Sequence, residues 1–178
     1  MDEIAAAAGL AKGTIYLYFQ GKEDLVQAIL SKVCETLLRD LAALVESSGF
    51  PWEKLQAIVA LLMKHLERER VWFTIYARDL RQGDRGKKGK PRPHNLDLEE
   101  QFVALLTRFF AAGSDTGTFI QVEPRLLAFL LRGLVRAAGY YQMLEKREDL
   151  VQETLPVLVT VLSSGLRRQP EATEALAI

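Results

Sequence analysis

Apolar residues recur at intervals of three and four along most of this 178-residue chain, which is the spacing of one face of an α-helix. The pattern predicts long helices at residues 23–47, 51–69, 98–112, 124–146 and 150–167, and a short aromatic helix at 71–81. The alternation of apolar and polar residues that marks a half-buried strand is close to absent. We therefore expect an all-α protein.

The first thirty residues form shorter units. An alanine-rich helix over residues 1–9 ends at Gly9, which can adopt the left-handed conformation, and a second short helix begins at Lys12 or Gly13. We expect Leu10 to fill the turn between them. Two short helices joined through a glycine form the helix-turn-helix motif, whose second helix enters the DNA major groove. Similar pairs also occur in helical bundles that bind no DNA, so spacing alone leaves both interpretations open.

The residues themselves favour the DNA interpretation. The segment GLAKGTIYLYFQGKEDLVQAIL closely resembles the DNA-binding segment of TetR-family transcriptional repressors. The resemblance implies a helix-turn-helix domain followed by a helical ligand-binding and dimerisation bundle. It also implies a homodimer that binds palindromic, double-stranded operator DNA. The residues expected at the DNA are Lys12, Gly13, Thr14, Tyr16, Leu17 and Lys22.

Each of these residues has an expected role. By resemblance, Lys12 and Thr14 reach base edges, whereas Tyr16 and Lys22 contact backbone phosphates. Gly13 lets the DNA approach the helix backbone. Leu17 departs from the polar or aromatic residue often found at its position, and its remaining option is a thymine methyl group.

Charge and length qualify this prediction. The chain has 23 basic and 23 acidic residues, and residues 1–32 hold three lysines against four carboxylates. Phosphate neutralisation supplies most non-specific affinity for DNA. Family members also have another helix before this segment, where this chain begins. We therefore expect the chain as written to bind operator poorly, and an extension of about 20–30 residues, typical of a helix and its loop, to restore binding.

Serine, glycine and proline at residues 47–51 mark a boundary. We expect residues 1–46 to form the DNA-binding region with its connecting helix, and residues 47–178 to form the ligand-binding and dimerisation domain. A small, mostly apolar effector is expected there, such as an acyl-coenzyme A or a drug-like compound. Its expected pocket residues are Met63, Trp72, Phe73, Tyr76, Phe102, Phe109 and Tyr140. Core packing would explain the three aromatic residues at 72–76 equally well.

Residues 82–95 are rich in lysine, arginine, glycine and proline, which predicts a flexible loop. The two C-terminal helices are apolar around most of their circumference, which predicts a four-helix bundle across a two-fold axis. Pro156 should kink the second of them.

Other classes of function receive little support. The single Cys34 fits a reducing compartment and is expected to be a small core residue, and His65 and His94 lack partners at metal-ligand spacing. We expect no metal or cofactor, no signal peptide, no membrane partner and a cytoplasmic location. No catalytic motif is recognisable, so we expect no enzyme. The alternative is a dimeric ligand-binding or interaction module that no longer binds DNA.

Overall fold

The computed structural model describes residues 1–69, 93–145 and 150–166, and these parts of the chain are helical with short connections. The helices are α1 (Asp2–Ala7), α2 (Lys12–Tyr18), α3 (Lys22–Glu46), α4 (Pro51–Arg68), α6 (Pro93–Asp115), α7 (Pro124–Glu145) and α8 (Leu150–Leu166). The all-α prediction is confirmed. The aromatic helix expected at 71–81 lies outside the described residues.

Two predicted boundaries are wrong, both at α6. The loop expected to reach residue 95 ends earlier, because α6 begins at Pro93 and proline fits the first turn of a helix. The helix expected to end at residue 112 continues to Asp115. Gly113 remains helical there, and the ring of Phe119 occupies the space where its side chain would lie. The turn that follows uses Gly117, whose φ is 71°.

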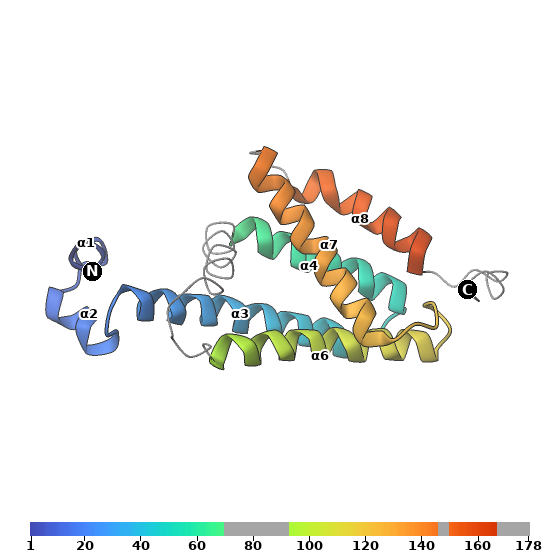
Figure 1. The fold of residues 1–178 in the computed structure, drawn as a ribbon, viewed down its shortest axis with the longest axis horizontal. Coiled ribbons are helices and arrows are strands. Elements are labelled where there is room, and N and C mark those ends of the chain that lie inside the picture. Colours follow the sequence, from blue (N-terminus) through green and yellow to red (C-terminus); the bar gives the residue numbers. More distant parts are fainter. Residues whose placement is uncertain (70–92, 146–149, 167–178) are drawn as a thin grey trace, which may run out of the picture.

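Four helices form the centre of the molecule. α3 and α7 each pack against both α4 and α6, and α8 covers α4 and part of α7. α3 is the longest helix, with 25 residues, and it extends from this body to the N-terminal helices (Figure 1). It therefore connects two regions that lie at opposite ends of its axis.

The body has one continuous core. Its centre includes Leu41 of α3, Ile58 of α4 and Phe110 of α6, all fully buried. Phe110 packs at 5.3 Å from the ring of Phe109 and at 5.6 Å from that of Phe119, measured between ring centroids. Burial of each large apolar side chain contributes roughly 1.5–3 kcal/mol. This core fixes the inner surfaces of α3, α4, α6 and α7.

Lys54 of α4 fastens the C-terminal end of α3 to this body. Its Nζ donates hydrogen bonds to the carbonyl oxygens of Val45, at 2.7 Å, and Ser47, at 2.9 Å. The last carbonyls of a helix have no partner within the helix and carry partial negative charge. The lysine therefore satisfies exposed acceptors and holds this end of α3 in place.

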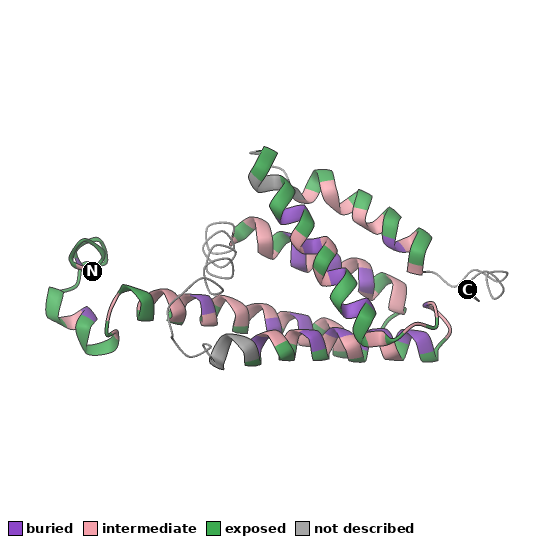
Figure 2. Cartoon of the chain, in the orientation of Figure 1, coloured by how far each residue is buried: buried purple, intermediate pink, exposed green. Residues whose placement is uncertain are grey.

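α1 and α2, which we call the N-terminal pair, are built on very little buried surface. Ala5 and Ile15 are their two buried residues (Figure 2). Gly9 has φ 68°, so the left-handed conformation predicted for it is confirmed. The prediction for Leu10 is wrong, since this side chain is 47% exposed. Two helices of six and seven residues are too short to enclose it.

Candidate functional site

The outer surface of α2 holds most of the residues expected at DNA. Lys12, Gly13, Thr14, Tyr16 and Leu17 lie on α2, and Lys22 is the first residue of α3. Leu17 is 82% exposed, Tyr16 is about half exposed, and Lys12, Gly13 and Lys22 are also exposed. Thr14 is partly buried. All six residues are therefore at least partly exposed to solvent, along α2 and at the start of α3.

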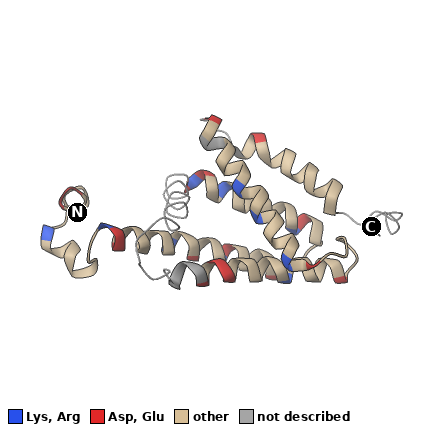
Figure 3. Ribbon diagram, viewed as in Figure 1, with Lys and Arg blue, Asp and Glu red and all other residues tan. Residues whose placement is uncertain are grey.

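Lys12 is the single cationic residue of α2 (Figure 3). Its Nζ donates a hydrogen bond to Asp2 of α1, and this ion pair is exposed to solvent. The carboxylate raises the pKa of Lys12 above its usual value. Lys12 therefore remains charged, but a neighbouring carboxylate competes for it.

A cavity of about 190 Å³ lies beside α3 in the body; we call it the α3 cavity. Residues 30–38 of α3 form one wall, and α4, α6 and α7 complete it. Most of its lining is apolar. The apolar lining residues, with Cys34 included, are Leu30, Val33, Cys34, Leu37, Leu38, Leu62, Leu66, Leu98, Phe102 and Val135.

Five polar side chains also line the cavity: His65, Glu69, Glu99, Arg132 and Arg136. Arg132 of α7 and Glu99 of α6 form an ion pair that is largely shielded from solvent. Burial lowers the pKa of His65, so its imidazole is neutral near pH 7. The cavity is therefore apolar with a small set of charged groups, which is typical of sites for small organic ligands.

Cys34 contributes a neutral thiol to the wall. Burial raises the pKa of this thiol above its usual value, and the charge of the adjacent Glu35 raises it further. A thiol that stays protonated is a weak nucleophile. The side chain therefore contributes to the cavity as a small apolar group.

The pocket residues expected from the sequence lie in several places. Phe102 lines the α3 cavity, whereas Met63 and Phe109 belong to the buried core and Tyr140 is 45% exposed on α7. Trp72, Phe73 and Tyr76 lie outside the described residues. Sequence reasoning did not select Arg132 and Arg136, although two cations one turn apart on a very apolar helix were a usable signal.

α7 and α8 carry many exposed apolar side chains. They are Leu126, Phe129, Leu130, Tyr140, Tyr141, Leu144, Val157 and Val161. Figure 2 marks exposed positions along both helices. Exposed apolar side chains that gather on two helices in contact mark an interaction site more often than free surface. Within the described residues, no helix is both long and apolar enough to cross a membrane.

Residues 1–29 match the family described as bacterial regulatory proteins, tetR family. A fatty acid metabolism regulator protein of Bacillus subtilis strain 168 is 22% identical over 171 residues, which is 95% of this chain and 86% of that protein.

Solved structures share the fold. A transcriptional regulator FadR from Bacillus subtilis, in complex with stearoyl-CoA, superposes with a TM-score of 0.75 and 21% identity, over 92% of this chain and 87% of the other. AibR, in complex with isovaleryl coenzyme A and operator DNA, has a TM-score of 0.66 and 23% identity, over 90% and 84% of the two chains. The chain therefore resembles the tetR family of bacterial regulatory proteins over residues 1–29, and it shares its all-helical fold with these two regulators.

Proposed function

We propose that this protein is a homodimeric transcriptional repressor that a small, mostly apolar effector releases from operator DNA. The observation that carries the proposal is the position of α3. Residues 30–38 of this helix line the α3 cavity, and the same helix begins at Lys22, four residues after the end of α2. A ligand that displaces α3 therefore displaces the N-terminal pair.

The N-terminal pair would be the DNA-binding element. Lys12 and Thr14 are proposed to reach base edges, and Tyr16 and Lys22 to contact phosphates, with a free helix N-terminus adding backbone N–H donors at Lys22. Leu17 would lie against a thymine methyl group. The exposure of Tyr16 and Leu17 supports this assignment, because large apolar side chains on free surface usually serve a contact.

The exposed faces of α7 and α8 would form the dimer interface. Two such faces joined across a two-fold axis make a four-helix bundle, which buries the apolar side chains that one copy exposes. A symmetric dimer would place its two α2 helices on operator half-sites about 34–36 Å apart. Residues 1–46 are proposed as the DNA-binding part and residues 47–178 as the ligand-binding and dimerisation part. α3 is the last helix of the proposed DNA-binding part, but it packs against α4 and α6 of the ligand-binding part.

The effector is proposed to be an acyl-coenzyme A or a compound of similar character. The apolar lining of the α3 cavity supports this, as do the similar proteins that bind stearoyl-CoA and isovaleryl coenzyme A. The cavity volume of about 190 Å³ is modest, since a cavity of roughly 150 Å³ accommodates benzene. A short or branched acyl group would fill it.

A second function has support from one observation. The N-terminal pair has only two buried side chains, and its one lysine on α2 is already paired with Asp2. A dimeric ligand-binding module that no longer binds DNA would show these features.

Operator selection from random duplexes, followed by fluorescence anisotropy, separates the two functions. If the protein is a repressor, it enriches a palindromic sequence, and K12A lowers affinity for that sequence at least about tenfold, the loss of one or two charge-assisted contacts. K32A is the matched control, because Lys32 is an exposed lysine on α3. Enrichment of no sequence, either by the chain as written or by a form extended by about 20–30 residues, would favour the ligand-binding module.

A further inference from the structure

The ion pair between Arg132 and Glu99 lies between two hollows. Both residues line the α3 cavity, and both also line a depression formed with Asp97, Glu100, Val103 and Phe129. The pair therefore stands where the apolar cavity meets a more polar depression on the side of α6 and α7. A ligand that occupies the cavity and extends into this depression must pass the two charged groups.

Arg132 is held in place by more than Glu99. Its guanidinium also lies over the ring of Phe129, 5.9 Å from the centroid, and its side chain is only 19% exposed. A guanidinium stacked on an aromatic ring keeps its position when one hydrogen-bonding partner leaves. The carboxylate is therefore the exchangeable member of the pair and the cation is the fixed one.

We propose that Arg132 binds an anionic group of the effector, and that Glu99 is the internal carboxylate which this group displaces. The proposal rests on the repressor function proposed above and specifies its ligand as an amphiphile that presents one of its anionic groups to Arg132, beside a short apolar tail. Arg136 lies one turn further along α7 and lines the same cavity. Two guanidiniums on one face of a helix offer the planar donors that suit carboxylates and phosphates.

The charged side chains around the cavity are consistent with the binding of one anionic group at Arg132. The lining holds two arginines, Arg132 and Arg136, and two glutamates, Glu69 and Glu99. Of the two glutamates, Glu69 is also paired with Arg68, at 3.4 Å. Displacement of Glu99 into the depression leaves one positive charge unmatched. An anionic group at Arg132 restores the balance, whereas a neutral ligand leaves Glu99 where it is.

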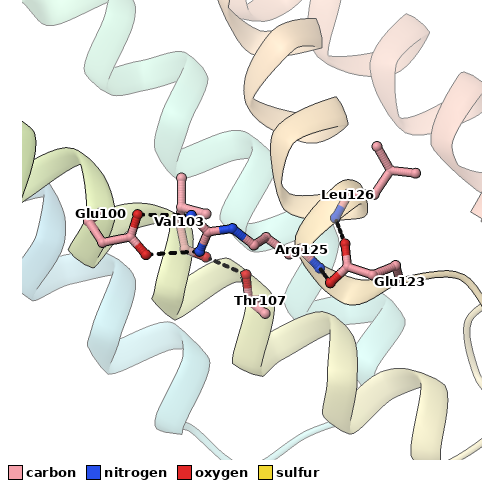
Figure 4. A network of polar contacts seen from close by, with 6 residues as sticks. All are labelled: Glu100, Val103, Thr107, Glu123, Arg125 and Leu126. Carbon is pink, nitrogen blue, oxygen red and sulfur yellow. Dashed lines mark hydrogen bonds and ion pairs between the residues drawn. The ribbon is translucent and has the colours of Figure 1, made fainter.

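The same two helices supply a matched control. Arg125 of α7 pairs with Glu100 of α6 through hydrogen bonds of 2.8 and 2.9 Å (Figure 4), and it also lies over Phe129, at 5.5 Å. This pair resembles the first in its residue types, helices and aromatic neighbour. However, Arg125 and Glu100 do not belong to the lining of the α3 cavity, and their side chains are 45% and 61% exposed.

Three probes of equal length but different charge test the proposal: hexanoate, 1-hexanol and hexylammonium. Their dissociation constants are measured by NMR titration on the whole chain, and the readout is the preference for hexanoate over 1-hexanol. R132Q should lower this preference at least about tenfold, the ratio that a charge-assisted hydrogen bond supplies. E99Q should raise it severalfold, because the competing carboxylate is gone. R125Q should leave it within a factor of two.

R132Q leaves Glu99 without this partner and could unfold the protein, so the double variant E99Q/R132Q is measured as well. It removes both charges at once and should also lose the preference for hexanoate, with its helical circular dichroism intact. An unchanged preference in R132Q or in the double variant overturns the proposal but leaves the repressor function standing. Tighter binding of hexylammonium than of hexanoate by the wild-type chain also overturns it, since Glu99 would then be the recognition group. Failure of all three probes to bind overturns the proposal for Arg132 and Glu99, whereas operator selection tests the repressor function separately.

Discussion

The N-terminal pair and the four-helix body differ in how they are held together. In the body, α3, α4, α6 and α7 share a continuous core that includes three packed phenylalanine rings. In the N-terminal pair, Ala5 and Ile15 provide the buried contacts, and neighbouring apolar side chains such as Leu17 remain exposed. Stability in this protein is therefore concentrated in the region that contains the cavity, whereas the residues proposed to contact DNA lie on a region with little stability of its own.

The difference suits a switch. Regions with few buried contacts open at lower free energy than the core, so a small displacement of their support alters them first. α3 provides that support, because its C-terminal half is fixed by the body and its N-terminal end leads into α2. A ligand in the α3 cavity would contact residues 30–38, which lie between the N-terminal end of the helix and the part packed in the core.

The largest effect is expected in the body. Phe110→Ala removes a fully buried ring that packs on Phe109 and Phe119. The cavity left behind should cost about 3–5 kcal/mol of unfolding free energy. At roughly 2–4 °C per kcal/mol for a chain of this length, the melting temperature should fall by about 6–20 °C. Circular dichroism measures this. A loss below about 1 kcal/mol would contradict the packing described for the core.

Two glycines sharpen the comparison. Gly113→Ala in α6 would place a methyl group in the ring of Phe119, and such overpacking typically costs about 1–3 kcal/mol. Gly13→Ala in α2 meets open space and should stabilise the helix slightly. For operator binding we expect the reverse. The Gly13 variant should bind operator more weakly than the Gly113 variant, because the new methyl group at residue 13 obstructs close approach of DNA. If the Gly13 variant binds operator like the wild type, DNA does not contact this backbone.

Ile15→Ala tests whether the N-terminal pair unfolds by itself. Ile15 is the buried side chain of α2 and is 5% exposed. Its truncation should raise amide hydrogen exchange throughout residues 2–18 to the rate of open chain, with exchange in α4 and α6 unchanged. The main thermal transition should move by less than about 2 °C. A shift as large as that of the Phe110 variant would show that the two regions unfold together.

The smallest effect is expected in the pH dependence of stability, through His65 in the wall of the α3 cavity. Burial lowers the pKa of His65, so the folded state binds fewer protons than the unfolded chain below about pH 6.5, the usual histidine value. Stability should therefore fall as the pH drops from about 6.5 through the lower pKa of the folded state. Chemical denaturation of His65→Gln at pH 7.5 and 5.5 measures this contribution, and the variant should lose less stability between them. Equal losses in both proteins would show that His65 does not titrate as the structure implies.

The helices could be predicted from sequence more fully than the site. Their apolar periodicity and prolines such as Pro51 and Pro124 mark the helices well. The cavity depends instead on which side chains leave space when four helices meet. Phe102 was predicted there, but Arg132 and His65 were not, because a helical face does not reveal its opposing partners. Leu10 was expected to fill the turn between α1 and α2. It is exposed instead, because these two short helices do not enclose it.

Coupling between the α3 cavity and operator DNA is the central claim, and one titration tests it directly. The affinity for the selected operator is measured by fluorescence anisotropy, alone and with saturating isovaleryl-CoA or stearoyl-CoA. We expect at least one of them to weaken operator binding by about 5–150-fold, the usual range of coupling between sites. Operator should weaken binding of that acyl-CoA by the same factor. If calorimetry shows that an acyl-CoA binds while the operator affinity stays unchanged, the cavity does not control the N-terminal pair.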